Sequence, residues 1–106
     1  GEDEIRDLAR LHLVTLLIDE KAYDEALKLL EGNVTPAFSA RFIDSRGDVL
    51  SAQGKKDEAR KAYQLALDTL SGAQNGGANS QNWQLESSAV YREIIQQKLD
   101  ALGTKG

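Results

Sequence analysis

The stretch GDVLSAQGKKDEARKAYQLA, residues 47–66, carries the clearest structural pattern in the chain. Two antiparallel helices approach each other closely only where one presents a Gly or Ala and the other a large side chain that fills the space. Gly47 and Ala59 occupy such positions, and Tyr63 supplies the large side chain. Gly54 suits a tight turn between the two helices. The stretch therefore predicts a hairpin of two closely packed helices.

A second copy of this pattern precedes the first at a spacing of 33 residues. The matching residues are Val14, Leu17, Ala26 and Leu30, opposite Gly47, Leu50, Ala59 and Tyr63. A period of about 34 with small residues at fixed helix positions is the signature of tetratricopeptide repeats. The first copy departs from it at Val14, which replaces a small residue, and at Lys21, which replaces the turn glycine. We predict an all-α fold, a tetratricopeptide-like right-handed array of two helical hairpins followed by a capping helix.

Start and stop signals divide the chain into two repeats and a cap within one domain. Thr35 followed by Pro36 predicts the start of a helix with Thr35 as its N-cap, and Gly32 and Gly103 suit helix ends. Residues 71–82 have almost nothing to bury, so we expect a mobile loop there. Over residues 1–106 we predict a repeat at 5–32, a repeat at 36–70, the loop at 71–82 and a capping helix at 83–102.

Composition excludes several functional classes. The 106 residues are 41% apolar and 28% charged, as in an ordinary globular domain. The net charge is −4, so nucleic-acid binding, which needs a basic surface, is not expected. The absence of cysteine excludes thiolate chemistry, and a single histidine makes an imidazole-rich metal site hard to assemble. No apolar run is long enough to span a bilayer, and we expect neither a cofactor nor a metal ion.

The first helix, predicted over residues 3–20, is apolar on nearly all sides. Its apolar faces are formed by Ile5, Ala9 and Leu16, by Leu13 and Leu17, and by Leu11, Val14 and Ile18. Such a helix must be buried on nearly all sides, yet the second and third helices can cover only part of it. We expect the rest to pack on a preceding repeat or on a second copy of the chain. The second case predicts a homodimer through the first helix.

The residues that could support catalysis do not form a complete set. His12 has only Thr15 as a polar neighbour three or four residues away, so it lacks the partners of a catalytic base. Asp44 and Asp48 share a helix face with Arg41 one turn earlier, but two carboxylates alone complete neither a metal site nor a catalytic pair. We expect an ion network of Arg41 with these aspartates on the exposed groove face, and no enzymatic activity.

Arrays of this kind bind partners with an inner face that the first helix of each pair forms. The predicted inner face consists of Leu8, Leu11, His12, Thr15, Ile18, Arg41, Asp44, Ser45 and Asp48. An apolar patch beside an Arg/Asp patch fits recognition of a protein surface or an extended segment. The Lys and Asn residues with which cytosolic co-chaperone repeats capture a terminal carboxylate are missing, so that ligand is not expected.

Several short strings extend the pattern: LARL at 8–11, YDEAL at 23–27, RGDVL at 46–50, QG at 53–54, EAR at 58–60, AY at 62–63 and AL at 66–67. With these strings, the chain resembles the family of the ancillary subunit of the bacterial Sec translocon. The resemblance covers most of residues 5–70 and the helix at 92–102. It implies a short cytoplasmic N-terminus, one transmembrane helix and a periplasmic tetratricopeptide domain, of which this chain would be the C-terminal part.

The function that the resemblance implies is that of a protein–protein interaction scaffold. It would be a membrane-tethered accessory of the Sec translocon at the periplasmic face of the inner membrane, where it links secretion to periplasmic chaperones. The transmembrane helix would lie outside this chain, and no catalytic residues are implied. The repeat pattern alone leaves an alternative, a tetratricopeptide adaptor of another envelope or cytosolic assembly. A hydrolase is a third class, but the chain lacks the nucleophile–base set that a hydrolase needs.

Overall fold

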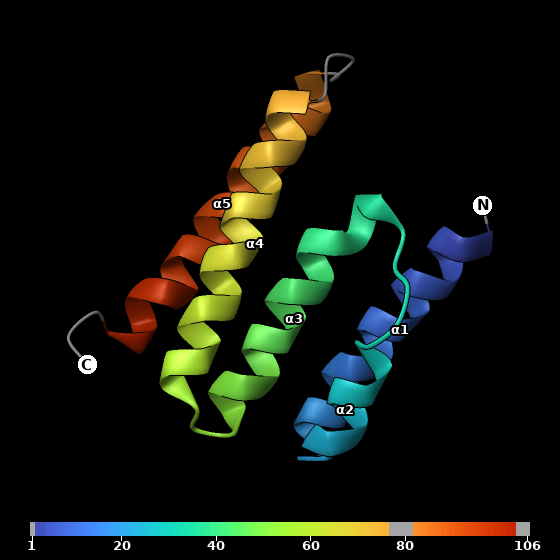
Figure 1. Cartoon of the computed structure of the whole chain (residues 1–106), viewed down its shortest axis with the longest axis vertical. Helices are drawn as coiled ribbons and strands as arrows, with labels where there is room; N and C mark the ends of the chain where they lie inside the picture. Colours follow the sequence, from blue (N-terminus) through green and yellow to red (C-terminus); the bar gives the residue numbers. More distant parts are fainter. Residues whose placement is uncertain (1, 77–81, 104–106) are drawn as a thin grey trace.

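All regular secondary structure in the described part of the chain is helical. The computed structural model describes the backbone of residues 2–76 and 82–103 and the side chains of residues 2–72 and 89–103. Its elements are α1 (Glu2–Asp19), α2 (Tyr23–Leu29), the 3-10 helix η1 (Pro36–Phe38), α3 (Ser39–Ala52), α4 (Lys56–Gly76) and α5 (Asn82–Leu102) (Figure 1). No strand occurs within these ranges, and the predicted all-α fold is confirmed.

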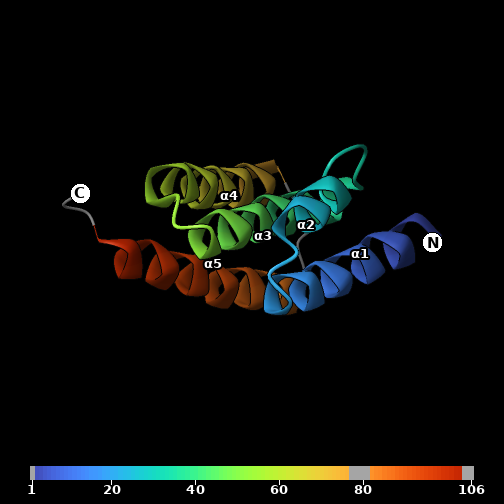
Figure 2. The ribbon, with the colours of Figure 1, turned by 90° about the horizontal axis from the view of Figure 1, so that it is seen from below.

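The helices form two hairpins that stack side by side. α1 packs against α2, α4 packs against α3, and α3 also contacts both helices of the first hairpin. α5 packs along α4, at the opposite end of the stack from α1 (Figure 1). Seen from below, α1 and α5 lie on the same side of α3 (Figure 2). The predicted array of two helical hairpins followed by a further helix is confirmed.

The 33-residue register is visible in the packing. Ala26 and Ala59 occupy equivalent places in the two hairpins, and both are fully buried. Gly47 lies against the Tyr63 ring, and a Cβ atom added to Gly47 would lie 2.6 Å from Cε1 of that ring. Only glycine therefore allows α3 and α4 to approach each other this closely.

Gly47→Ala is expected to destabilise the chain by about 1–3 kcal/mol, the usual cost of overpacking a core. The Tyr63 ring cannot move aside freely, because its hydroxyl donates a hydrogen bond of 2.6 Å to Asp48. Urea unfolding measures the change. Gly72→Ala is the matched control, because no atom lies within 4 Å of a Cβ added at Gly72. There alanine should raise stability by about 0.5–1 kcal/mol, and an equal gain at Gly47 would contradict the close packing.

The turns of the two hairpins share a backbone conformation. Gly54 has a φ of +84°, and Lys21, at the equivalent place of the first hairpin, has a φ of +62°. The left-handed conformation is costly for a residue with a Cβ atom, so Lys21 occupies a position that suits glycine. The first repeat thus keeps the geometry of the turn although it lacks the turn glycine.

We expect Lys21→Gly to stabilise the chain by about 0.5–1 kcal/mol. Relief of left-handed strain, about 1–2 kcal/mol, should outweigh the conformational entropy that a glycine loses on folding. Thermal unfolding measures the gain as a higher melting temperature. Lys55→Gly is the control, because Lys55 lies beside Gly54 without a positive φ and should gain nothing. A lower melting temperature for Lys21→Gly would mean that the turn is not strained.

Two apolar clusters hold the stack together. The first consists of Val14, Ala26 and Val49 and joins α1, α2 and α3. The second consists of Leu50, Ala59, Ala62, Tyr63, Ala66, Ile95 and Leu99. α5 supplies Ile95 and Leu99 to this second cluster, so α5 covers one side of the second hairpin.

The predicted boundaries differ from the structure around the loop. α4 continues to Gly76, so residues 71–76, expected in the loop at 71–82, are helical. Each residue added to an existing helix gains a hydrogen bond while only its own backbone is fixed. A helix can therefore continue through residues of low intrinsic preference. Residues 77–81 of the predicted loop lie outside the described residues. α2 ends at Leu29, before Gly32, which the sequence indicated as suiting a helix end.

A buried acidic residue fixes α1 against the segment before α3. Asp7 is fully buried, and its Oδ2 accepts hydrogen bonds from the backbone N–H and the hydroxyl of Thr35, at 2.7 and 2.8 Å. Oδ1 of Asp7 accepts a hydrogen bond from Arg10 at 3.1 Å. The Thr35 backbone N–H is the main cause of a lowered pKa for Asp7. Thr35 does precede the helix, with Pro36 in the first turn, but its side chain bonds to Asp7 and does not cap the helix.

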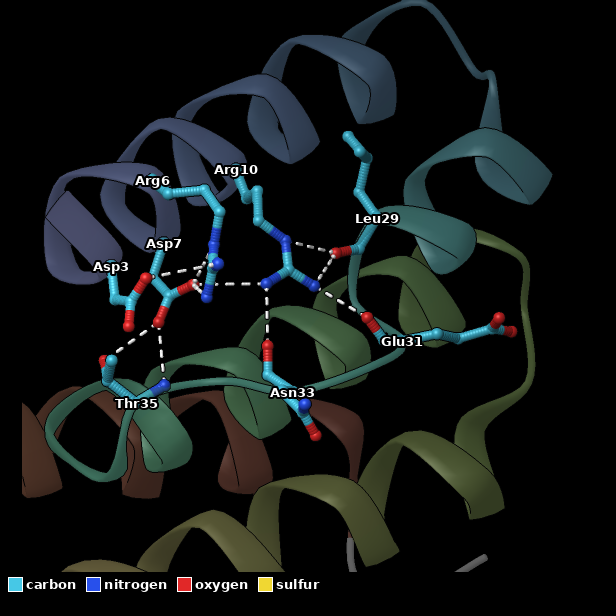
Figure 3. A network of polar contacts seen from close by, with 8 residues as sticks. All are labelled: Asp3, Arg6, Asp7, Arg10, Leu29, Glu31, Asn33 and Thr35. Carbon is cyan, nitrogen blue, oxygen red and sulfur yellow. Dashed lines mark hydrogen bonds and ion pairs between the residues drawn. The ribbon is translucent and has the colours of Figure 1, made fainter.

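The Arg10 guanidinium closes the end of α2. It donates hydrogen bonds of 2.6–3.0 Å to the backbone carbonyl oxygens of Leu29, Glu31 and Asn33 (Figure 3). The last carbonyls of a helix have no partner within the helix, so Arg10 satisfies groups that would otherwise need water. Its guanidinium carbon also lies 4.7 Å from the centroid of the Phe42 ring. We call Asp7, Arg10 and Thr35 the clasp.

Candidate protein-binding site

A groove runs between α1 and the start of α3. It encloses about 450 Å³ and is lined by Leu8, Leu11, His12, Thr15, Phe38 and Arg41. All of these except Phe38 belong to the predicted inner face. The clasp holds α1 beside the segment before η1.

The groove combines apolar and polar side chains. Leu8 is 47% exposed, and Leu11 and Phe38 are half-buried beside it. His12 is exposed on the α1 wall and Arg41 on the α3 side. A half-exposed leucine between two partly covered apolar side chains offers area that a partner could bury.

Arg41 is positioned by α5. Its guanidinium carbon lies 4.5 Å from the centroid of the Tyr91 ring, within the range of a cation–π interaction. The contact places an exposed cation at the edge of an apolar groove. Such a site suits a peptide segment that presents an apolar side chain next to a carboxylate.

The remaining predicted inner-face residues do not line the groove. They are Ile18, Asp44, Ser45 and Asp48. Ile18 is half-buried against the first apolar cluster, and Ser45 is half-buried as well. Asp44 is only 5% exposed, because side chains of α5 cover this part of α3. The predicted ion network of Arg41 with Asp44 and Asp48 is therefore wrong.

Asp44 and Asp48 instead form a network with α4 and α5. The Tyr91 hydroxyl donates a hydrogen bond of 2.6 Å to Oδ2 of Asp44, and the Tyr63 hydroxyl donates one of 2.6 Å to Oδ1 of Asp48. Lys98 Nζ lies 3.0 Å from Oδ1 of Asp44 and 3.2 Å from Oδ2 of Asp48. We call these five residues the tyrosine–carboxylate cluster.

The sequence held a signal for this cluster. Tyr91 and Lys98 are seven residues apart, so both lie on one face of the last helix. Asp44 and Asp48 are four residues apart, so they also share a face. Matching a face with a phenol and an ammonium group to a face with two carboxylates would have predicted that the last helix docks on α3.

Burial and neighbouring charges shift the pKa values of the cluster. Burial raises the pKa of Asp48, although Tyr63 and Lys98 act in the opposite direction. Burial and the bonded carboxylates raise the pKa values of Tyr63 and Tyr91 above their usual 10.0. Burial alone would lower the pKa of Lys98, but Asp48 and Asp44 together raise it above 10.5. The three donors keep their protons at neutral pH, so the cluster ties α5 to α3.

Two further properties concern the described residues alone. Within residues 2–72 and 89–103, whose side chains are described, no group of His, Asp and Glu side chains is placed to hold a metal ion. No helix in the described backbone, residues 2–76 and 82–103, combines the length and the apolar character that crossing a membrane requires. The groove can bind a ligand through non-covalent contacts with its apolar surface, an imidazole, a hydroxyl and a guanidinium group.

Stacked helical hairpins with a groove along their inner face define a class of helical-repeat proteins that bind other proteins. The family model described as a tetratricopeptide repeat-like domain matches residues 1–104, and the chain belongs to this family. The fold predicted from the 33-residue spacing and the family assignment therefore agree.

One relative among characterised proteins is the ancillary SecYEG translocon subunit of Neisseria gonorrhoeae (strain ATCC 700825 / FA 1090). The two sequences are 34% identical over 98 residues, which are 92% of this chain and 40% of that protein. The chain thus spans less than half the length of this relative. The resemblance to the translocon-subunit family predicted from the sequence is confirmed. Comparison with solved structures finds no match.

Proposed function

We propose that the chain is a protein-interaction module of an accessory protein of the Sec translocon, and that the groove between α1 and α3 binds a segment of a partner protein. The observation that carries the proposal is the groove, where exposed Leu8 lies among apolar side chains and Arg41 stands at the edge. The name of the Neisseria relative supports the translocon as the assembly. A segment with an apolar side chain and a carboxylate fits these groups best.

The proposed setting follows the resemblance to the translocon-subunit family. The module would act at the periplasmic face of the bacterial inner membrane, with a transmembrane helix outside this chain as its tether. There it would link emerging proteins to periplasmic chaperones. The homodimer through the first helix remains a prediction.

Capture of partners by groove variants tests the proposal. The tagged chain is crosslinked to proteins of the inner membrane, and quantitative mass spectrometry measures the recovered translocon components. We expect Leu8→Asp and Arg41→Glu each to lower recovery by about tenfold or more, the effect of losing roughly 1.4 kcal/mol of binding free energy. Leu65→Asp is the matched control, because Leu65 on α4 is also 47% exposed.

Other outcomes separate the alternatives. If the groove variants recover translocon components as well as Leu65→Asp does, the groove is not the binding site. If they lose a different set of proteins, the chain is an adaptor of another assembly. Circular dichroism of each variant confirms that the helices remain folded, as expected for substitutions at exposed positions.

A further inference from the structure

The cation at the edge of the groove differs in its contacts from the other cations of the fold. Arg41 Cζ lies over the Tyr91 ring, 4.5 Å from its centroid, yet Arg41 is exposed. Within the part of the chain whose side chains are described, the Arg41 guanidinium makes no ion pair and no hydrogen bond with the protein. Arg10 and Lys98, by contrast, bond to protein oxygens. Arg41 therefore has one side covered by a ring while its N–H groups remain free.

Side chains of α5 bond to the carboxylate nearest to Arg41 along α3. Asp44 lies three residues after Arg41, a spacing at which ion pairs form on a helix. Both Asp44 oxygens already have partners on α5. The Tyr91 hydroxyl donates a hydrogen bond of 2.6 Å to Oδ2, and Lys98 Nζ lies 3.0 Å from Oδ1. α5 thus occupies the carboxylate that could neutralise Arg41, and Tyr91 places its ring against Arg41 instead.

The Tyr91 ring is itself held in place. Its hydroxyl is bonded to Asp44, which is only 5% exposed, and its ring packs against the second apolar cluster. A ring fixed both at its hydroxyl and by its packing has little freedom to move. The guanidinium group that lies on this ring is restricted as well, because the cation–π attraction favours one position of Arg41 over the others.

A restricted guanidinium group suits the recognition of a carboxylate. Arginine side chains stack on aromatic faces, and the N–H donors of a stacked guanidinium point along its plane, away from the ring. A carboxylate binds such an edge through two parallel hydrogen bonds. A side chain that is already ordered loses less conformational entropy when its ligand binds, so Tyr91 should raise the affinity for a carboxylate without touching it.

We propose that Tyr91 is a positioning residue of the groove, and that it presents the N–H groups of Arg41 to a carboxylate of the bound segment. α5 lies on the same side of α3 as α1 (Figure 2), so Tyr91 can act at the edge of the groove without lining it. The inference rests on the proposed function, because it assigns the specificity of the same groove. The carboxylate belongs either to an Asp or Glu side chain or to a chain end, and the binding of matched peptides separates these two sources.

Peptides selected for the groove serve as the probes. A library of random peptides displayed on phage is selected on the 106-residue chain, and clones that also bind the Leu8→Asp variant are removed. A selected peptide that contains Asp or Glu is synthesised with a fluorescent label and a C-terminal amide. Its amide copy has Asn or Gln in place of the acidic residue, and a third peptide is the amide copy with a free C-terminus. Fluorescence anisotropy measures the dissociation constant of each peptide.

We expect the chain to bind the acidic peptide about tenfold more tightly than its amide copy, the low end of the effect of charge-assisted hydrogen bonds. Tyr91→Leu should lower this ratio by about threefold or more, because Arg41 must then become ordered on binding. Tyr91→Phe keeps the ring and should retain the ratio. In Arg41→Gln the ratio should be about one, and adding Tyr91→Leu should not change it further. If the free C-terminus restores tight binding to the amide copy, Arg41 also accepts the carboxylate of a chain end.

Leu99→Ala is the control for a general loosening of α5. Leu99 packs in the second apolar cluster, about two turns of α5 away from Tyr91, so its loss should leave the ratio unchanged. An unchanged ratio in Tyr91→Leu, or an equal fall in Leu99→Ala, would overturn the inference while the groove still binds peptides. Groove ligands that contain no Asp or Glu would overturn it in the same way. A selection that yields no ligand sensitive to Leu8→Asp contradicts the proposed function itself, and the inference falls with it.

Discussion

Arg10→Ala should destabilise the first hairpin by about 1–3 kcal/mol, the usual cost of leaving buried hydrogen-bond acceptors without a donor. The substitution removes the ion pair with Asp7 and the hydrogen bonds to the carbonyl groups at the end of α2. α1 and α2 should then unfold before α3 and α4, because stacked repeats depend mainly on their neighbours. Urea unfolding and hydrogen exchange of the α1 and α2 amides measure both effects.

Arg6→Ala is the matched control for the clasp. Arg6 also reaches Asp7, at 3.3 Å, but its side chain is 52% exposed, so we expect a loss below about 1 kcal/mol. Arg10→Lys should behave like Arg10→Ala, because an ammonium group cannot make the forked set of hydrogen bonds of a guanidinium. Equal losses for Arg6→Ala and Arg10→Ala would mean that the clasp is an ordinary surface ion pair.

Raising the pH above 10 should release α5 from α3. The folded-state pKa values of Tyr63, Tyr91 and Lys98 lie above their unfolded values of 10.0 and 10.5. Their contribution to stability is therefore fully present below pH 10 and is lost as the pH rises toward the folded-state pKa values. Each group can lower the free energy of unfolding by at most about 1.4 kcal/mol per pH unit. Urea unfolding between pH 8 and about pH 12 measures the slope.

Tyr91→Phe tests the origin of this alkaline slope. The variant lacks one of the three titrating groups, so its stability should fall less steeply above pH 10 than that of the parent. An unchanged slope would mean that the cluster does not cause the alkaline transition.

Asp7 makes stability depend on pH at acidic pH. Its lowered pKa gives a contribution that is present above its usual 3.8 and is lost as the pH falls below that value. Acid should therefore loosen the first hairpin.

The fold could be predicted because its determinants are local and repeated. Gly47, Gly54 and Ala59 lie 33 residues after Val14, Lys21 and Ala26, and the structure uses Gly47 for close packing and Gly54 for the left-handed turn. The spacing of apolar residues in the sequence could not predict where α4 ends. Its continuation to Gly76 depends on the preceding helical turns, whereas the prediction weighed the preference of each residue alone.

The groove could be predicted on α1 but only in part on α3. Leu8 and Thr15 line it as expected, because the stacking of the hairpins fixes the inner side of α1. Asp44 is buried because α5 docks over α3, and the sequence of α3 alone contains no trace of that contact.

The clasp was missed for a related reason. Asp7 has the character of a surface charge in the sequence, and its burial depends on Thr35, which lies 28 residues further along the chain. Spacing along a helix predicts contacts between residues three or four apart. The contact between Asp7 and Thr35 joins α1 to the segment before η1, so spacing cannot predict it. Only the stacked arrangement of the hairpins brings the two residues together.

Photocrosslinking from inside the groove is the most direct test of the protein-binding groove. A photoreactive amino acid replaces either Thr15, which lines the groove, or Lys61, whose exposed side chain lies on α4. In cells that contain the translocon, we expect position 15 to crosslink to a translocon component and position 61 to give no such product. Equal yields from the two positions, or no product from position 15, would contradict a protein-binding groove between α1 and α3.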